Sequence, residues 1–263
     1  MKKARRDIRL LLVEDNITNQ EVALRILQHL GYETVQVAPD GSQALAVLAA
    51  QDFDLVLMDC HLPDLDGYET SRRIRNRGSA VRDHDIPIVA TTAAAMESDR
   101  RKCFDAGMNA YLAKPLRFDA LDQVIQEWTG GPPAGKPLSH LPTVPGKAPR
   151  FDPVALEESV MGNEALARRI LRTFVDDMPR QIALLARAVS DGNATQVRML
   201  AHSIKGAAAS VSGLEMMDAS SKLEQQGHDG NLKSAANAVC ELSASFERTR
   251  PMMEDFCREN PDD

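Results

Sequence analysis

The chain has 263 residues, which exceeds the roughly 100 to 200 residues of a typical single domain, so two compact domains are expected. Hydrophobic residues make up 43% of the sequence and charged residues 26%, a balance that excludes a disordered or fibrous chain. The net charge of −7 at pH 7, without a basic stripe, is a poor match to the phosphates of nucleic acid, so we expect protein partners instead.

Cysteine spacing and hydropathy limit the cellular setting. The four cysteines lie far apart without a Cys-x-x-Cys pair, which predicts neither a disulfide framework nor a zinc site and fits a reducing cytoplasm. No stretch reaches the ~18 continuous apolar residues that cross a bilayer, and residues 1–9 lack the apolar core of a signal peptide. The sequence therefore predicts a cytoplasmic chain that makes no membrane contact of its own.

Five short apolar runs alternate with helical patterns in the first half of the chain. The runs lie at residues 8–13, 34–38, 54–58, 86–91 and 110–113. Runs that are apolar along their whole length belong in a sheet that is covered by helices on both faces. The pattern predicts an α/β domain over residues 1–129, with a doubly wound, five-stranded parallel sheet.

Proline and glycine are concentrated in residues 130–149, a composition that resists helix and strand formation and predicts a linker. From residue 150 to 263, apolar residues recur at spacings of three and four, which predicts helices throughout. Short connections are expected near Pro179, at 191–193, at 212–213 and at 227–231. Short connections favour antiparallel neighbours, so this half is predicted to be an all-α bundle.

Polar side chains follow four of the predicted strands at the point where each strand ends. Glu14 and Asp15 follow the first strand and Asp59 the third, while Thr92 closes the fourth strand and Lys114 follows the fifth. The carboxyl ends of parallel strands meet at one edge of the sheet, and clustered carboxylates there are costly unless a cation such as Mg²⁺ compensates them. One carboxylate is then left as a nucleophile, and the hydroxyl and ammonium could stabilise a phosphoryl group. Two adjacent acids alone would fit a solvated loop equally well.

Four segments of this half resemble the receiver domains of two-component signalling. They are LLVEDNITNQ (11–20), LVLMDCHLPDLDGYE (55–69), IPIVATTAAA (86–95) and YLAKP (111–115). The likeness spans residues 7–129. It implies a flavodoxin-like fold that accepts a phosphoryl group on one aspartate with the help of Mg²⁺.

The resemblance also implies a role for each matching acid and for the lysine. Asp59 would be the phosphoacceptor, and Lys114 would contact the phosphate. Glu14 and Asp15 would be the acidic metal pair, and the metal would also be bound by Asp59 and by the backbone carbonyl of His61.

The resemblance further implies two residues that respond to phosphorylation. Thr92 would be the switch hydroxyl and Tyr111 the switch aromatic residue. Thr91 competes for the first role, but Thr92 precedes an alanine and has the separation from Lys114 that the family usually has.

One histidine of the second half lies on an unusual face of its helix. Residues 196–213 predict a helix whose apolar stripe consists of Val197, Leu200, Ile204, Ala208 and Val211. At ~100° per residue, His202 lies nearly opposite that stripe, so its imidazole is expected to point into solvent. A lone helical histidine is otherwise an ordinary surface or core residue. Lys205 could neutralise phosphoryl oxygens, and Gly206 leaves a bare helix surface for a partner.

The segment AHSIKGAAA (201–209) is similar to the signature of histidine-containing phosphotransfer (HPt) domains, and the likeness covers about residues 150–250. It implies a four-helix bundle that carries the phosphoryl group on His202, with Arg198, Gly206 and Ala209 in the docking surface and Lys205 beside the histidine.

The two resemblances together predict phosphorelay signalling, like the C-terminal part of hybrid sensor histidine kinases. A kinase histidine would pass a phosphoryl group to Asp59, which would exchange it with His202, which would pass it to a downstream response regulator. No P-loop pattern is present, so another protein must supply the phosphate. Two alternatives remain at this stage: a binding module regulated by phosphorylation, and a phosphate sink without onward transfer.

Overall fold

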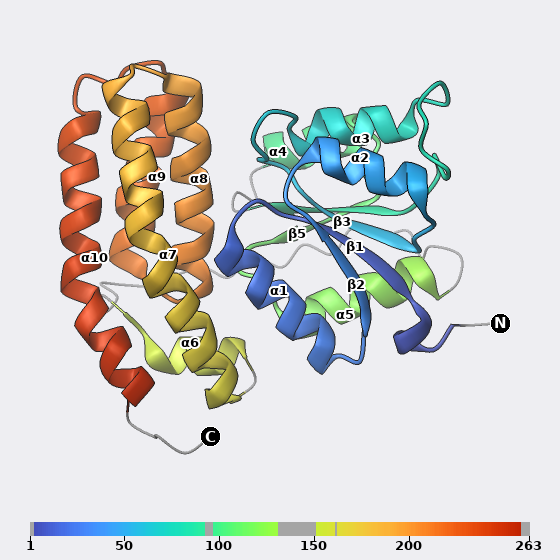
Figure 1. The fold of residues 1–263 in the computed structure, drawn as a ribbon, viewed down its shortest axis with the longest axis horizontal. Coiled ribbons are helices and arrows are strands. Elements are labelled where there is room, and N and C mark those ends of the chain that lie inside the picture. The colour runs from blue at the N-terminus through green and yellow to red at the C-terminus, as the bar shows by residue number, and fades with distance from the viewer. Residues whose placement is uncertain (1–2, 93–96, 131–150, 161, 259–263) are drawn as a thin grey trace. The chain divides into compact units, whose positions relative to one another are not determined.

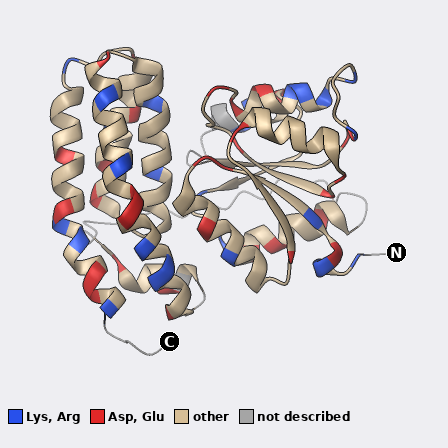
Figure 2. Cartoon of the chain, in the orientation of Figure 1, with Lys and Arg blue, Asp and Glu red and all other residues tan. Residues whose placement is uncertain are grey.

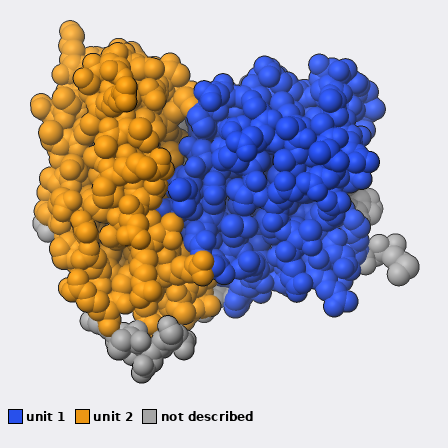
Figure 3. Space-filling model, viewed as in Figure 1, with its two compact units in different colours: residues 1–143 blue, residues 144–263 orange. Residues whose placement is uncertain are grey.

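The structure, a computed structural model, describes residues 3–92, 97–130, 151–160 and 162–258 (Figure 1). The chain divides into two compact units, residues 1–143 and 144–263 (Figure 3). The predicted linker at 130–149 lies outside the described residues except for Gly130. The expected domain limits of 129 and 150 therefore stay predictions.

The first unit contains the predicted five-stranded parallel sheet. The strands are β1 (Arg9–Val13), β2 (Thr34–Ala38), β3 (Leu55–Asp59), β4 (Ile88–Thr92) and β5 (Ala110–Ala113). All neighbouring pairs are parallel, in the order β2-β1-β3-β4-β5. This doubly wound order confirms the predicted α/β fold class.

Helices cover both faces of the sheet. They are α1 (Ile17–His29), α2 (Gly41–Ala50), α3 (Gly67–Arg75), α4 (Glu97–Asp105) and α5 (Phe118–Thr129), preceded by a short 3₁₀ helix at Arg5–Asp7. Figure 1 shows α1 and α5 on one face and α2 and α3 on the other. Each of α1, α2 and α3 begins after an N-cap side chain, Asn16, Asp40 or Asp66, that accepts a hydrogen bond from a backbone N–H in the first turn.

The core of this unit lies between the sheet and its helices. Every residue of β3 and β4 is buried, as are the last four residues of β1. Strands without a polar alternation have no face for solvent, which is why the sequence pattern required helices on both sides. The buried sheet fixes the edge at which the polar strand-end residues emerge.

The second unit is a four-helix bundle with one additional short helix. It consists of α6 (Pro153–Ser159), α7 (Glu164–Ser190), α8 (Ala194–Ser210), α9 (Leu214–His228) and α10 (Ala235–Arg258). Helix α7 packs on α8 and α10, and α9 packs on the same two helices, which closes the bundle. The rings of Phe174 and Phe246 meet edge to face in its core.

The connection expected near Pro179 is wrong, because α7 continues through it from Glu164 to Ser190. Proline is tolerated there because the buried residues Phe174, Met178 and Ile182 keep the apolar stripe on both sides of it.

Among the described residues, no helix has the length and hydropathy required to cross a membrane. Figure 2 shows basic and acidic residues interspersed over both units.

Candidate functional site

The carboxyl ends of the strands bring the predicted site residues of the first unit together. Glu14 and Asp15 follow β1 directly, Asp59 is the last residue of β3, and Thr92 is the last residue of β4. Lys114 follows β5. Since the strands are parallel and in register, these positions share one edge of the sheet.

Lys114 joins two of the carboxylates. Its Nζ donates to Asp59 Oδ2 and to Glu14 Oε2, both at 2.6 Å. The side chains of all three residues are 3% to 4% exposed. Burial lowers the pKa of the Lys114 ammonium, but the two carboxylates outweigh burial and raise the pKa above its ordinary value. The lysine therefore stays charged beside Asp59.

The acids of this cluster carry more negative charge than Lys114 compensates. One oxygen each of Glu14, Asp15 and Asp59 lies within 4.8 Å of the others. Burial first, and then the neighbouring acids, raise the pKa of Glu14 to about 8 and that of Asp15 to about 7. Asp15 Oδ1 is buried, and no described residue hydrogen bonds to it. A buried, unpaired carboxylate oxygen beside two further acids is a fitting place for a hard divalent cation.

Asp59 is fixed from both sides. Its Oδ1 accepts a hydrogen bond from the backbone N–H of His61 at 3.0 Å, and its Oδ2 accepts from Lys114. The two candidates for the switch hydroxyl, Thr91 and Thr92, are 1% and 2% exposed. Their burial therefore does not decide which of them has that role. Tyr111 is partly buried in β5, and its ring meets Phe104 of α4 edge to face at 6.5 Å.

His202 of α8 is held by a glutamate of the next helix. Its Nδ1 lies 2.6 Å from Glu224 Oε1, and the other carboxylate oxygen of Glu224 accepts from Lys205 Nζ, also at 2.6 Å. Burial raises the pKa of Glu224, but the hydrogen bonds from His202 and Lys205 outweigh it and lower that pKa to about 2. The glutamate is therefore an anion at neutral pH.

The expectation of an imidazole standing in solvent stays a prediction. Within its own unit the ring is not part of the bundle core, because it lies about 140° around α8 from the face formed by Val197, Ile204 and Ala208. A helical wheel drawn for a single helix predicts the direction of a side chain but not its partners on other helices, and here that partner is Glu224 of α9.

Of the residues expected around His202, Lys205 shares the carboxylate of Glu224 with the ring. Arg198, Gly206 and Ala209 lie on the same helix, α8. Glu224 was not among the predicted site residues. The only sequence signal for it was the Leu223–Glu224 pair at a position comparable to the HPt family, and its contact with His202 depends on tertiary structure.

Comparison with known proteins decides the family. Residues 10–126 match the response regulator receiver domain, and residues 169–250 match the Hpt domain. The chain joins a receiver domain to an Hpt domain. Both are phosphotransfer modules of phosphorelay signalling.

Curated relatives match most of this chain within much longer proteins. The sensor protein EvgS of Escherichia coli is 31% identical over 218 residues, which cover 82% of this chain and 17% of that protein. The sensor histidine kinase GacS of Pseudomonas protegens is 32% identical over 211 residues, which cover 76% of this chain and 22% of that protein. The chain thus spans about a fifth of the length of these relatives.

Two solved structures each resemble about half of the chain. The receiver domain of a sensor histidine kinase from Pseudomonas aeruginosa, crystallised with a magnesium ion in its active site cleft, is 44% identical, with a TM-score of 0.43 and coverage of 47% of this chain and 98% of that chain. A co-crystal structure of the Saccharomyces cerevisiae phosphotransfer protein Ypd1 with the Ssk1 receiver domain matches at 32% identity, with a TM-score of 0.42 and coverage of 46% of this chain and 88% of that chain.

Two cysteines meet next to Asp59. Cys60 Sγ lies 3.7 Å from Cys103 Sγ, and both residues are buried. The contact with Cys103 and burial raise the pKa of the Cys60 thiol well above its ordinary value. The sequence spacing gave no sign of this pair, which is a protonated, packed contact and not a reactive thiolate.

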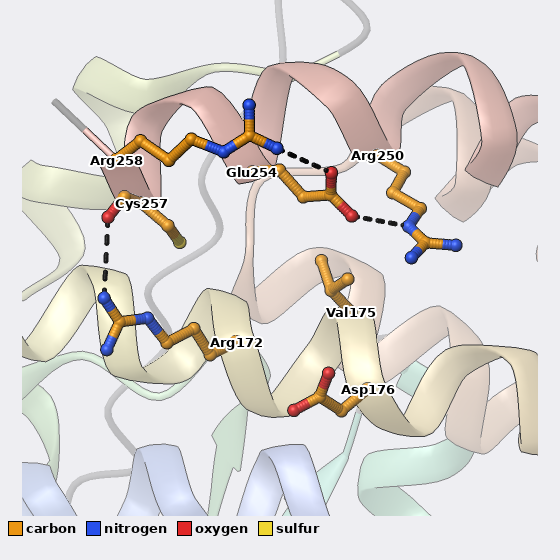
Figure 4. A pocket seen from close by; sticks show the side chains of 7 residues that line it. All are labelled: Arg172, Val175, Asp176, Arg250, Glu254, Cys257 and Arg258. Carbon is orange, nitrogen blue, oxygen red and sulfur yellow. Dashed lines mark hydrogen bonds and ion pairs between the residues drawn. The ribbon is translucent and has the colours of Figure 1, made fainter.

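The Hpt half also contains a cavity of about 260 Å³ between α7 and α10 (Figure 4). Arg172, Arg250 and Glu254 are among its lining residues. Glu254 accepts hydrogen bonds from Arg250 at 2.7 Å and from Arg258 at 3.3 Å, so these charges largely compensate one another. None of the predicted site residues lines this cavity.

Proposed function

We propose that the chain is a phosphorelay intermediate in which Asp59 and His202 exchange a phosphoryl group. The observation that carries the proposal is the presence, in one chain, of a buried carboxylate held by Lys114 and a helix histidine held by Glu224. A sensor histidine kinase would supply the phosphoryl group, and a downstream response regulator would receive it. The setting would be the cytoplasm.

Asp59 is the proposed nucleophile of the receiver domain. Its carboxylate oxygen attacks the phosphorus of a phosphohistidine, an O–P bond forms, the N–P bond breaks, and the departing imidazole takes up a proton. Lys114, 2.6 Å from Asp59, places a positive charge where phosphoryl oxygens gain negative charge. Thr92 and Tyr111 are the proposed switch residues that report the phosphorylated state.

Magnesium fits this site. Glu14, Asp15 and Asp59 would hold the ion, with the backbone carbonyl of His61 as a further ligand. The support is the buried, unpaired Oδ1 of Asp15 and the raised pKa values of Asp15 and Glu14, which are signs of uncompensated negative charge. When bound, Mg²⁺ would neutralise the carboxylates and the phosphoryl oxygens.

His202 is the proposed nucleophile of the Hpt domain. An Nδ1–H that donates to the Glu224 carboxylate leaves the imidazole lone pair on Nε2, which makes Nε2 the attacking atom. In the transfer, an N–P bond forms at Nε2, the O–P bond to Asp59 breaks, and Asp59 departs as a carboxylate. Lys205 shares Glu224 with the ring, so it lies near the position of the incoming phosphoryl group.

A labelling experiment tests the relay. The full chain is incubated with a histidine kinase carrying a radiolabelled phosphoryl group, alongside Asp59→Asn and His202→Gln chains. We expect acid-labile, base-stable label on the wild type that is absent from both variants. A wild-type chain whose label is only the base-labile acyl phosphate of Asp59 would instead favour the regulated binding module or the phosphate sink.

Transfer within one chain is proposed as the main route. A random coil of twenty residues, the length of the predicted linker, spans ~25 Å root-mean-square, a reach that supports this proposal. A mixture of Asp59→Ala and His202→Ala chains should therefore relay more slowly than the wild type at the same concentration. Equal rates would establish transfer between chains.

A further inference from the structure

Helices α8 and α9 meet backbone to backbone at Gly227. A Cβ atom on Gly227 would lie 2.6 Å from the backbone nitrogen of Arg198, 2.8 Å from its Cα and 2.8 Å from the carbonyl oxygen of Ala194. Real Cβ atoms essentially never come within 3.0 Å of such neighbours. All three are backbone atoms of α8, so no side chain can turn aside. A residue larger than glycine at this position would have to move a helix.

Nothing in the local backbone of α9 calls for glycine at position 227. Gly227 lies inside α9 (Leu214–His228), and its φ is not in the left-handed region that favours glycine. Glycine within a helix costs ~1 kcal/mol relative to alanine. The close approach to α8 is therefore the feature that requires glycine.

This contact lies next to the proposed catalytic histidine. Gly227 is three residues after Glu224, and Arg198 is four residues before His202, so the contact is one helical turn from the His202–Glu224 pair on both helices. Because helices behave as stiff rods over one turn, the spacing of α8 and α9 at Gly227 sets their spacing at Glu224.

We propose that Gly227 is a positioning residue, which holds α9 close enough to α8 for Glu224 to reach Nδ1 of His202. An ordinary Cβ contact begins at 3.4 Å, so alanine at 227 would move the helices apart by about 0.8 Å, the difference between 3.4 and 2.6 Å. Added to the 2.6 Å between Nδ1 and Oε1, this shift gives about 3.4 Å, beyond the usual range of a hydrogen bond. The role of the His202–Glu224 hydrogen bond in phosphoryl transfer rests on the proposed function. The distance between Nδ1 and Oε1 does not depend on that function.

The first test reads the hydrogen bond directly. The full chain is labelled with ¹⁵N-histidine, and the imidazole signals of His202 are assigned by comparison with His202→Gln. In the wild type we expect a slowly exchanging Nδ1–H proton, and in Gly227→Ala we expect that signal to vanish. Gly213→Ala is the matched control, because a Cβ on Gly213 would meet its nearest atom at 3.4 Å, an ordinary contact. An unchanged Nδ1–H signal in Gly227→Ala would overturn the inference.

The second test asks whether Gly227 acts through Glu224. Gly227→Ala should slow phosphoryl transfer to His202 by about tenfold or more in the wild-type background, but it should have no further effect in a Glu224→Gln background, as a double-mutant cycle requires for coupled residues. Equal slowing in both backgrounds would mean that Gly227 acts on the fold alone and would refute the proposal.

Further measurements keep the inference separate from folding and from the relay itself. Should Gly227→Ala not fold, Glu224→Asp decides, because it shortens the reach by one methylene group without moving a helix. Loss of the Nδ1–H signal in that variant supports the spacing argument, and its retention overturns it. If His202→Gln carries acid-labile, base-stable label as the wild type does, the relay through His202 fails, whereas the Nδ1–H signal still tests the role of Gly227.

Discussion

At the scale of single residues, the receiver site is a compromise between function and stability. Three acids and one lysine share a buried edge of the sheet, and the lysine contacts only two of the acids, Glu14 and Asp59. The third acid is Asp15, and no described residue donates a hydrogen bond to its buried Oδ1. Its charge is unfavourable in the absence of a cation, because neighbouring carboxylates repel one another.

Asp15→Asn should therefore stabilise the chain in the presence of a chelator. We expect the free energy of unfolding to rise by about 1 to 3 kcal/mol, since one of three clustered charges is removed. Urea unfolding in EDTA measures it, with the exposed Asp7→Asn as the control that should change little. The same variant should gain less stability from added Mg²⁺ than the wild type. A less stable Asp15→Asn chain in EDTA would contradict this account of the acidic cluster.

Glu224 gives the Hpt domain a pH dependence of known sign. Its pKa in the folded chain is about 2, below the ordinary 4.5. A lowered acid pKa contributes stability that is fully present above pH 4.5 and is lost as the pH falls toward 2. Glu224→Gln should lack this contribution, about 1 to 3 kcal/mol, so its stability should fall less than that of the wild type between pH 6 and pH 3. The exposed Glu241→Gln serves as control, and parallel pH curves for Glu224→Gln and the wild type would refute the assignment.

At the scale of elements, the sequence predicted what depends on local pattern and missed what depends on neighbours. The strands β3 and β4 are buried along their whole length, so their apolar runs predicted both the sheet and the edge at which its strands end. The position of that edge in turn predicted which polar residues lie together. The partner of His202 could not be predicted in this way, because Glu224 lies on another helix and only the packing of α8 on α9 brings the two together.

Pro179 illustrates the same limit in α7. Proline usually marks a helix end, but here the apolar stripe continues through it and tertiary packing decides. Since the side chain is exposed, Pro179→Ala should remove strain without losing packing and raise the free energy of unfolding by about 1 kcal/mol or more. Pro153→Ala is the control, because Pro153 is the first residue of α6, where proline costs little. Chemical denaturation measures the free energy of unfolding of both variants. A lower free energy of unfolding for Pro179→Ala than for the wild type would contradict the prediction.

At the scale of the whole molecule, the chain consists of two units with separate cores. The apolar core of the first unit lies between the sheet and its helices. The core of the second unit lies among the four long helices α7, α8, α9 and α10. Units with separate cores can unfold separately. The acids that we propose to bind Mg²⁺, Glu14, Asp15 and Asp59, belong to the first unit, so a bound cation should stabilise that unit and not the other.

The single tryptophan makes this separation measurable. It is Trp128, at the end of α5 in the receiver domain, so its fluorescence follows the unfolding of that unit, whereas circular dichroism follows helices of both. At a Mg²⁺ concentration one hundred times the dissociation constant, linkage predicts a stabilisation of ~2.7 kcal/mol. We expect the fluorescence midpoint in urea to rise by the corresponding amount, while the remaining circular dichroism transition of the Hpt domain stays in place. Asp15→Asn should reduce the fluorescence shift. A Mg²⁺ effect of equal size on both transitions would mean that the two units unfold together, because the proposed ligands lie in only one of them.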